Sequence, residues 1–389
     1  MQRTFDISFP GRTIYGDGAI QKLGAILTRY GFSHSVLLMD EGIKRSGIGA
    51  IVLEQLQGSV EKVSIIDDLA REPSDIDVNR VLGLVKQYNP DNVVAVGGGS
   101  VLDVAKLCSV LIPSDKDVLD LLNGGKVPAH TTFTTLIPTT SGTGSEATKN
   151  SIIAISAKKT KVAVVHENLL PDLVVLDPRL TVKMPVSITA TTGMDALCHA
   201  MECYLSIKAN VMSDMFAINA IEKIATSLRK VTIDGDDIEA RSDMLLASYY
   251  AGTCITLSGT NAVHALSYPL GTLFHIPHGH SNAILLPFVM EKNLAALPEK
   301  CKVIASAFGY DPEENKESPI EYLTRELYQL LQDLAISPSL KDFGVKRKDV
   351  GSLVEIAHGN RRLMDNNPID FTKEEIEEIY LRLLGEIKA

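Results

Sequence analysis

The sequence predicts two structural halves, an α/β N-terminal half and an all-helical C-terminal half. In the first half, short apolar β-rich runs alternate with helical patterns. From about Ser187 onward, the apolar residues recur with helical spacing only. At 389 residues, the chain also exceeds the length at which a single hydrophobic core stops growing, so two domains are expected.

The N-terminal half reads as strands that alternate with helices. Helices are predicted over 77–88 and 101–112. The predicted strands are 36–40, 60–67, 92–100, the apolar start of 133–146, 150–156, 160–166 and 172–178. Strand–helix alternation of this kind indicates a mostly parallel sheet covered on both faces.

The C-terminal half contains amphipathic helical patterns, for example over 214–230 and in the tail 371–389, where Thr372 precedes acidic residues typical of a first turn. The pattern changes near Lys183–Pro185. We therefore expect an α/β dinucleotide-binding domain over 1–184 and an all-helical domain over 185–389. No flexible linker separates them, so a cleft between them is the expected place for a site.

Composition excludes several classes of function. Apolar residues make up 45% of the chain and the mean hydropathy is +0.10, as in ordinary globular proteins. A net charge of −10 argues against general affinity for nucleic acid or anionic membranes. The N-terminus has no signal-peptide core, and the five cysteines show no CxxC spacing, so we expect a cytoplasmic protein with reduced thiols.

One segment, Met244–Met290, contains no Asp, Glu, Lys or Arg but holds His264, His275, His278 and His280. Several glycines and prolines interrupt it, which argues against a membrane span. The segment is therefore expected in the protein interior. Buried imidazoles need partners, and a metal ion can serve several of them at once.

Two glycine- and hydroxyl-rich loops follow predicted strands. Gly97–Ser100 opens a helix, where free N–H groups and the helix dipole favour a phosphate. Thr139–Glu146 offers hydroxyl donors without positive charge. Each loop alone could be an ordinary turn, but the pair indicates a nucleotide site. The ordinary dinucleotide fingerprint would need glycine at Leu102, so this is a variant design.

Asp40 ends the strand predicted at 36–40. Its carboxylate could accept hydrogen bonds from a ribose 2′-OH and repel a 2′-phosphate, which favours NAD over NADP. Asp is equally suited to capping a helix, and the sequence leaves both roles open.

A metal site is predicted from Asp195 and His199, which lie four residues apart and therefore on one helix face. His264 and His278 would complete one carboxylate and three imidazoles. That set suits Fe²⁺, Zn²⁺, Mn²⁺ or Co²⁺ and leaves room for a substrate oxygen. Spacing alone does not decide which of the four late histidines bind.

These motifs resemble the iron-containing, group III alcohol dehydrogenases over nearly the whole chain. The most specific are PTTSGTGSEAT (138–148), MPVSITATTGMDALCHAMECYL (184–205) and PHGHSNAILLP (277–287). GGGSVLDVAK (97–106), HALSYPLG (264–271) and NNPIDFTKEEI (366–376) extend the match.

The resemblance implies a Rossmann-like domain followed by an all-α domain, the dehydroquinate-synthase-like architecture, with the active site between them. It implies Asp195, His199, His264 and His278 as ligands of one divalent metal, Fe²⁺ or Zn²⁺. For the nicotinamide cofactor it implies Asp40, Gly97, Gly98, Ser100, Thr139, Thr140, Thr143 and Lys161.

The implied activity is that of an NAD-dependent alcohol dehydrogenase or aldehyde reductase, and the implied assembly is a homodimer. A metal would act as Lewis acid toward the oxygen of a small alcohol, while hydride passes between the carbinol carbon and the nicotinamide.

The chain departs from the family pattern at several positions. Tyr268 stands where many members have a second histidine assigned to proton transfer. A phenol titrates near pH 10, so His275 or His280 could take the relay role beside or instead of Tyr268. Glu72 stands where Asn-Pro is common. These changes make it unsafe to transfer any one member's substrate.

Other functions remain open at this point. Glycerol-dehydrogenase-like and hydroxyacid–oxoacid transhydrogenase activities are near alternatives. A dehydroquinate-synthase-like lyase needs lysines and arginines around the metal, which the uncharged segment disfavours. A nucleotide-binding module with a structural metal is disfavoured because the ligand set is not a closed Cys/His site.

Overall fold

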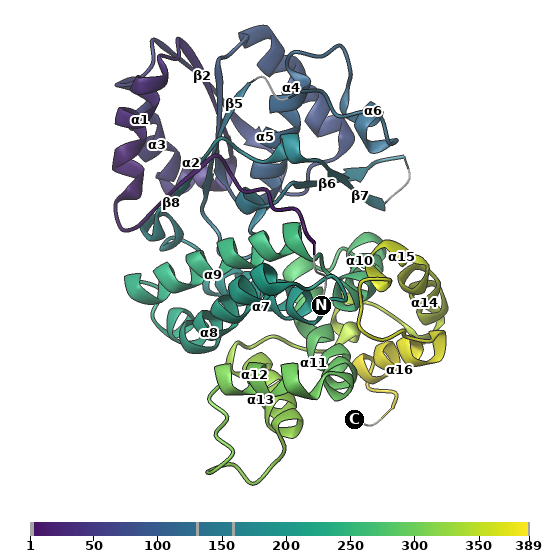
Figure 1. The fold of residues 1–389 in the computed structure, drawn as a ribbon. Coiled ribbons are helices and arrows are strands. Elements are labelled where there is room, and N and C mark those ends of the chain that lie inside the picture. Colours follow the sequence, from purple (N-terminus) through teal and green to yellow (C-terminus); the bar gives the residue numbers. More distant parts are fainter. Residues whose placement is uncertain (1–3, 130–131, 158–159, 388–389) are drawn as a thin grey trace. The chain divides into compact units, whose positions relative to one another are not determined.

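The computed structural model describes residues 4–129, 132–157 and 160–387. The chain divides into two compact units. Ser8–Met184 form the α/β unit, and Pro185–Ala389 form the helical unit together with the N-terminal residues up to Ile7. Figure 1 shows the sheet of the α/β unit and the helices of the other unit. The predicted fold class is confirmed.

The α/β unit is built on a six-stranded sheet in the order β1-β8-β5-β4-β2-β3, and every neighbouring pair is parallel. The strands are β1 (Arg12–Tyr15), β2 (His34–Asp40), β3 (Lys62–Leu69), β4 (Asn92–Gly97), β5 (Phe133–Pro138) and β8 (Leu173–Leu176).

Helices cover both faces of this sheet because its central strands are apolar on both sides. The helices of the unit are α1 (Leu23–Tyr30), α2 (Glu41–Ser46), α3 (Ile48–Gln57), α4 (Asp75–Tyr88), α5 (Gly99–Leu111) and α6 (Val118–Leu122). In β2, Val36 and Leu38 join the core beneath α4 and α5, whereas Leu37 and Met39 join the core beneath α1 and α3. Short 3₁₀ turns are η1 (Ala19–Lys22), η2 (Ser145–Ala147), η3 (Glu167–Leu169) and η4 (Pro178–Thr181).

Two predicted strands lie outside the parallel sheet. β6 (Asn150–Ile155) and β7 (Thr160–Val165) pair antiparallel with each other as a separate two-stranded sheet. Their connection is too short for the crossover that a parallel pair requires, so a hairpin is the only way for them to pair.

The helical unit packs around one apolar core. Its helices are α7 (Val186–Leu205), α8 (Val211–Ile233), α9 (Ile238–Leu257), α10 (Ala262–Phe274), α11 (His278–Ala296), α12 (Pro298–Ala307), α13 (Pro319–Asp333), α14 (Val350–Gly359), α15 (Arg361–Met364) and α16 (Lys373–Leu383), with 3₁₀ turns η5 (Leu340–Phe343) and η6 (Arg347–Asp349). Thr372 caps α16 as predicted, through a capping box with Glu375, but the helix ends at Leu383 rather than continuing through the tail.

The uncharged segment Met244–Met290 forms most of α9, all of α10 and the first two thirds of α11, and most of it is buried. The two prolines within its helices, Pro269 and Pro287, are also buried. Among the described residues, no helix is both long and apolar enough to span a bilayer.

A buried polar network ties α5 to the loop after β5. The Asp103 carboxylate accepts from Ser145 Oγ at 2.5 Å and from Ile152 N at 2.9 Å. The fully buried Lys106 ammonium donates to Thr148 Oγ1 at 3.0 Å. Glu146 lies buried beside this network, and its Oε1 has no hydrogen-bond partner among the described residues. Burial raises the pKa of Glu146 from 4.5 to about 7.

We predict that the pH dependence of stability reports on Glu146. The folded protein holds a proton there that the unfolded chain releases, so this contribution is full below pH 4.5 and is lost as the pH rises through about 7. The shift is equivalent to at most about 3 kcal/mol. Glu146→Gln, which mimics the neutral form, should lose less stability than wild type between pH 5 and pH 8 in urea unfolding. The exposed Glu54→Gln should behave like wild type, and identical pH profiles for all three proteins would contradict the assignment.

Candidate metal centre and nucleotide loops

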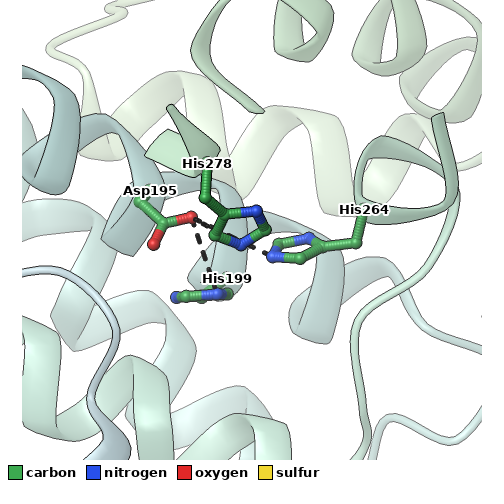
Figure 2. Close-up of side chains that lie close together, drawn as sticks. All are labelled: Asp195, His199, His264 and His278. Atoms are coloured by element: carbon green, nitrogen blue, oxygen red, sulfur yellow. Dashed lines mark ion pairs between the residues drawn. The ribbon is translucent and has the colours of Figure 1, made fainter. Parts of the chain in front are cut away.

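Three helices of the helical unit bring four predicted metal ligands together. α7 carries Asp195 and His199 one turn apart, α10 carries His264 in its first turn, and α11 begins at His278. One ligand atom from each of the four side chains lies within 4.8 Å of the others. Figure 2 shows the three imidazoles converging on the Asp195 carboxylate.

The distances within this cluster suit donors around a shared ion. Asp195 Oδ1 lies 3.7 Å from His199 Nε2, 3.8 Å from His278 Nε2 and 4.0 Å from His264 Nε2. These separations exceed ordinary hydrogen-bond lengths. Four donors around a tetrahedral ion with bonds of about 2.0–2.2 Å would lie roughly 3.3–3.6 Å apart. The donors are therefore somewhat farther apart than they would be around a bound ion.

The cluster also has a favourable charge for a cation. Burial alone would raise the pKa of Asp195, but the imidazoles of His199, His278 and His264 and a hydrogen bond from Asn282 outweigh it, so the net shift is downward. An ionised carboxylate in the interior needs a compensating charge close by. A divalent ion would meet that need directly.

Glu202 orients one of the histidines, and the sequence reasoning missed it. It is fully buried on α7, and Oε2 contacts His264 Nδ1. Its Oε1 accepts from Val263 N at 2.7 Å and Asn261 N at 3.2 Å. A carboxylate on Nδ1–H leaves the Nε2 lone pair for the cluster. The available signal was that Asp195 and Glu202, seven residues apart, are the only acids in α7.

The three residues predicted for proton transfer have different surroundings. Tyr268 lies beside the cluster, with its ring 6.1 Å from the His278 ring. Burial raises the pKa of Tyr268, and the nearby Arg362 guanidinium offsets this only in part.

Among the described residues, neither His275 nor His280, the other two residues predicted for proton transfer, is seen in contact with the four ligands. His280 is two residues from His278 on α11 and so points to a different side of the helix. Its Nε2 bonds to the Ser337 carbonyl at 3.0 Å and its ring packs against Phe343. His275 is exposed and ends α10 in a left-handed conformation, with φ of 55°.

In the α/β unit, the predicted cofactor segments follow three adjacent parallel strands. Asp40 ends β2, Gly97 ends β4, and Thr139 directly follows β5. The crevice outside the carboxyl ends of such strands is the usual ligand site of open parallel sheets. The sheet therefore gathers residues that lie about a hundred positions apart in the sequence.

The two glycine- and hydroxyl-rich loops lie against each other. Thr139 N donates to the Gly97 carbonyl at 3.0 Å. A Cβ on Gly99 would lie 2.7 Å from Thr143 Oγ1, and one on Gly98 would touch Thr140 at 3.4 Å. Glycine is therefore needed at Gly99 for the close approach. Ser100 lies in the first turn of α5, where backbone N–H groups suit a phosphate.

Asp40 and Lys161 each have a structural partner within the unit. Asp40 Oδ1 caps α2 by accepting from Ile43 N at 2.9 Å, so the helix-cap role is observed, and a carboxylate has a second oxygen that can accept from a ribose. Lys161 Nζ on β7 lies 3.4 Å from Glu72 Oε2, one of the positions where the chain departs from the family pattern. This partly exposed pair contributes at most about 1 kcal/mol to stability.

We predict that Glu202→Gln weakens metal binding by about 10- to 100-fold, because the amide no longer holds His264 Nδ1 as a carboxylate does. The measurement is competition for Co²⁺ against a chelator of known affinity. Glu222→Gln, an exposed change on α8, serves as the control. Unchanged Co²⁺ affinity in Glu202→Gln would mean that His264 does not depend on this carboxylate for its orientation.

Both structural units match models of one protein family. Residues 10–178 match the model for iron-containing alcohol dehydrogenase, and residues 189–384 match the model for the Fe-containing alcohol dehydrogenase family, C-terminal. The chain is 37% identical over 378 residues to long-chain-alcohol dehydrogenase 1 of Geobacillus thermodenitrificans, covering 96% of this chain and 95% of that protein.

Solved structures show the same similarity in three dimensions. The structure of a 1,3-propanediol oxidoreductase has a TM-score of 0.93 at 31% identity, with 98% of this chain and 100% of that chain covered. Sulfoacetaldehyde reductase from Bifidobacterium kashiwanohense, in complex with NAD⁺, has a TM-score of 0.90 at 26% identity, with 98% and 99% covered. These relatives are named for different substrates. The chain therefore belongs to the iron-containing alcohol dehydrogenases, which are metal-dependent, NAD-linked oxidoreductases.

Proposed function

We propose that this protein interconverts a small polar alcohol and its aldehyde with NAD(H), using one Fe²⁺ or Zn²⁺ ion held by Asp195, His199, His264 and His278. The convergence of one carboxylate and three imidazoles in the helical unit carries this proposal. In this assignment residues 1–184 bind the dinucleotide and residues 185–389 bind the metal and catalyse the reaction.

The donor set fits a catalytic rather than a closed structural ion. It contains no thiolate, and it combines nitrogen and oxygen donors that suit Fe²⁺ and Zn²⁺. A divalent ion bound there supplies Lewis acidity, which lowers the pKa of an alcohol and polarises a carbonyl. Glu202 holds one of these donors, His264, in place, and α10 adds no acidic side chain in its first turn and no basic side chain in its last turn.

For the cofactor, we propose that Gly97, Gly98, Ser100, Thr139, Thr140 and Thr143 hold the diphosphate and that Asp40 and Lys161 face the ribose. The two loops offer backbone and hydroxyl donors at the carboxyl edge of adjacent strands, which supports this placement. Asp40 would disfavour a 2′-phosphate, so the cofactor is NAD rather than NADP.

We propose Tyr268 as the polar group next to the reacting oxygen. Its raised pKa keeps the phenol protonated near neutrality, so it would donate a hydrogen bond rather than act as a base. His275 and His280 remain candidates for carrying the proton onward. Their separation from the cluster favours a role nearer to solvent.

We also propose that the protein is a cytoplasmic homodimer. The homodimer rests on the family alone. The five cysteines are free and buried, as expected in a reducing compartment, and the net charge of −10 gives no reason to expect nucleic acid or membrane partners.

We expect metal-stripped protein to lack activity with NADH and short polar aldehydes, and to regain it on addition of Fe²⁺ or Zn²⁺. Asp195→Ala should not bind the ion and should stay inactive, because the cluster loses its one anion. Metal content and NADH oxidation over an aldehyde panel provide the measurement. Glycerol, tested as a hydride donor to NAD⁺, distinguishes the glycerol-dehydrogenase-like alternative. A 2-oxo acid, tested as a hydride acceptor, distinguishes the transhydrogenase alternative.

Two results would contradict this proposal. If neither ion restores turnover of any aldehyde, the protein is not a metal-dependent reductase of this class. If NADPH is used in preference to NADH, the role given to Asp40 is wrong, and Asp40→Ala should then leave the cofactor preference unchanged.

A further inference from the structure

A fifth polar side chain, Asn282, contacts three of the four proposed ligands. It lies on α11, one turn after His278, and is fully buried. Its Nδ2 lies 2.7 Å from Asp195 Oδ1, 3.1 Å from His264 Nε2 and 3.2 Å from His278 Nε2. A single amide nitrogen thus covers the face of the cluster that these three atoms define.

The chemistry of these contacts fixes the direction of the hydrogen bond to Asp195. An ionised carboxylate only accepts, so one N–H of Asn282 donates to Asp195 Oδ1. His264 Nδ1 contacts Glu202, so in the neutral ring a proton on Nδ1 leaves Nε2 as an acceptor. The second N–H of the amide is directed toward the imidazole nitrogens, which are the same lone pairs that would bind a metal.

The other end of the amide shows that this orientation is imposed by the ligands. Asn282 Oδ1 is buried and has no hydrogen-bond partner among the described residues. A buried acceptor without a partner is unfavourable. Turning the amide over would place this oxygen against the Asp195 carboxylate and two imidazole lone pairs, which is worse. The contacts of the amide nitrogen with the cluster, and not those of the amide oxygen, therefore determine the orientation of the side chain.

We propose that Asn282 is a positioning residue of the metal centre: it holds Asp195, His264 and His278 in convergence and closes one face of the cluster. Before an ion binds, one of its N–H groups donates to Asp195 and the amide nitrogen lies within hydrogen-bond distance of both ring nitrogens. Once the imidazole lone pairs are engaged, the bond to Asp195 still fixes the carboxylate. An exogenous oxygen ligand must then approach from another face. This inference rests on the proposed ligand assignment.

The test compares Asn282→Leu with Asn293→Leu. Both residues are fully buried amides on α11, but Asn293 exchanges hydrogen bonds with Asn367 at 2.8 and 2.9 Å and is not in contact with the four ligands. Co²⁺ affinity is measured by chelator competition, and the visible spectrum of bound Co²⁺ reports its coordination. NAD affinity and the unfolding temperature of the metal-free proteins are measured alongside.

We expect Asn282→Leu to bind Co²⁺ about 10- to 100-fold more weakly, to release it faster and to show an altered Co²⁺ spectrum, with NAD affinity unchanged. Asn293→Leu should retain wild-type Co²⁺ affinity and spectrum. If the leucine variant of Asn282 does not fold, Asn282→Ala, which adds no bulk, should change Co²⁺ affinity in the same direction.

Unchanged Co²⁺ affinity and spectrum in a folded Asn282 variant would overturn the inference, as would an equal loss in Asn293→Leu. Failure of the ligand assignment itself would look different. In that case wild-type protein and Asp195→Ala would bind Co²⁺ equally, or neither would bind it.

Discussion

The proposed site depends on one buried carboxylate surrounded by three imidazoles. Asp195 is 2% exposed, and no lysine or arginine in the described part of the chain forms an ion pair with it. A carboxylate in such a place is stable only if positive charge lies nearby. The three imidazoles lower the pKa of this carboxyl, and a divalent cation bound among them would supply the compensating charge directly.

Two further buried residues, Glu202 and Asn282, contact different members of the cluster. Glu202 fixes the tautomer of His264, and Asn282 contacts the carboxylate and two ring nitrogens from one side. The helices of the uncharged segment bring no competing ion pairs. The helical unit offers acceptor groups to a cation, whereas two loops of the α/β unit offer N–H and hydroxyl donors to an anionic ligand. A Lewis acid and a phosphate-binding site together suit hydride transfer between an alcohol and a nicotinamide.

The fold class, the two nucleotide loops and the Asp195–His199 pair could be predicted from the sequence, because each depends on a strong local pattern. Apolar strands that end in glycine- or hydroxyl-rich loops predicted the sheet and two loops on it that suit a nucleotide. Asp195 and His199 were found through helical spacing. The β6–β7 hairpin was not separated from the parallel sheet, because its strands have the same composition as the others. Only the short connection between them shows the difference.

Other features could not be read from local patterns. Glu202 and Asn282 are ordinary residues for a helix, and their importance appears only when α7, α10 and α11 pack together. His275 and His280 were grouped with the cluster because they share its segment. The structure separates His280 from His278 because residues two apart lie on different sides of a helix. The segment is buried over most of its length, as predicted, but residues 271–280 are mostly half-buried or exposed, and the prediction of an interior position is wrong for His275.

The most direct test of the account is to locate the ion. Crystals of the protein loaded with Zn²⁺ should give a single strong anomalous difference peak at the zinc edge, bonded to Asp195, His199, His264 and His278 at about 2.0–2.2 Å. The peak should be absent from crystals of Asp195→Ala prepared in the same way. A loaded crystal with no peak among these four side chains, or with its main peak elsewhere, would contradict the central claim.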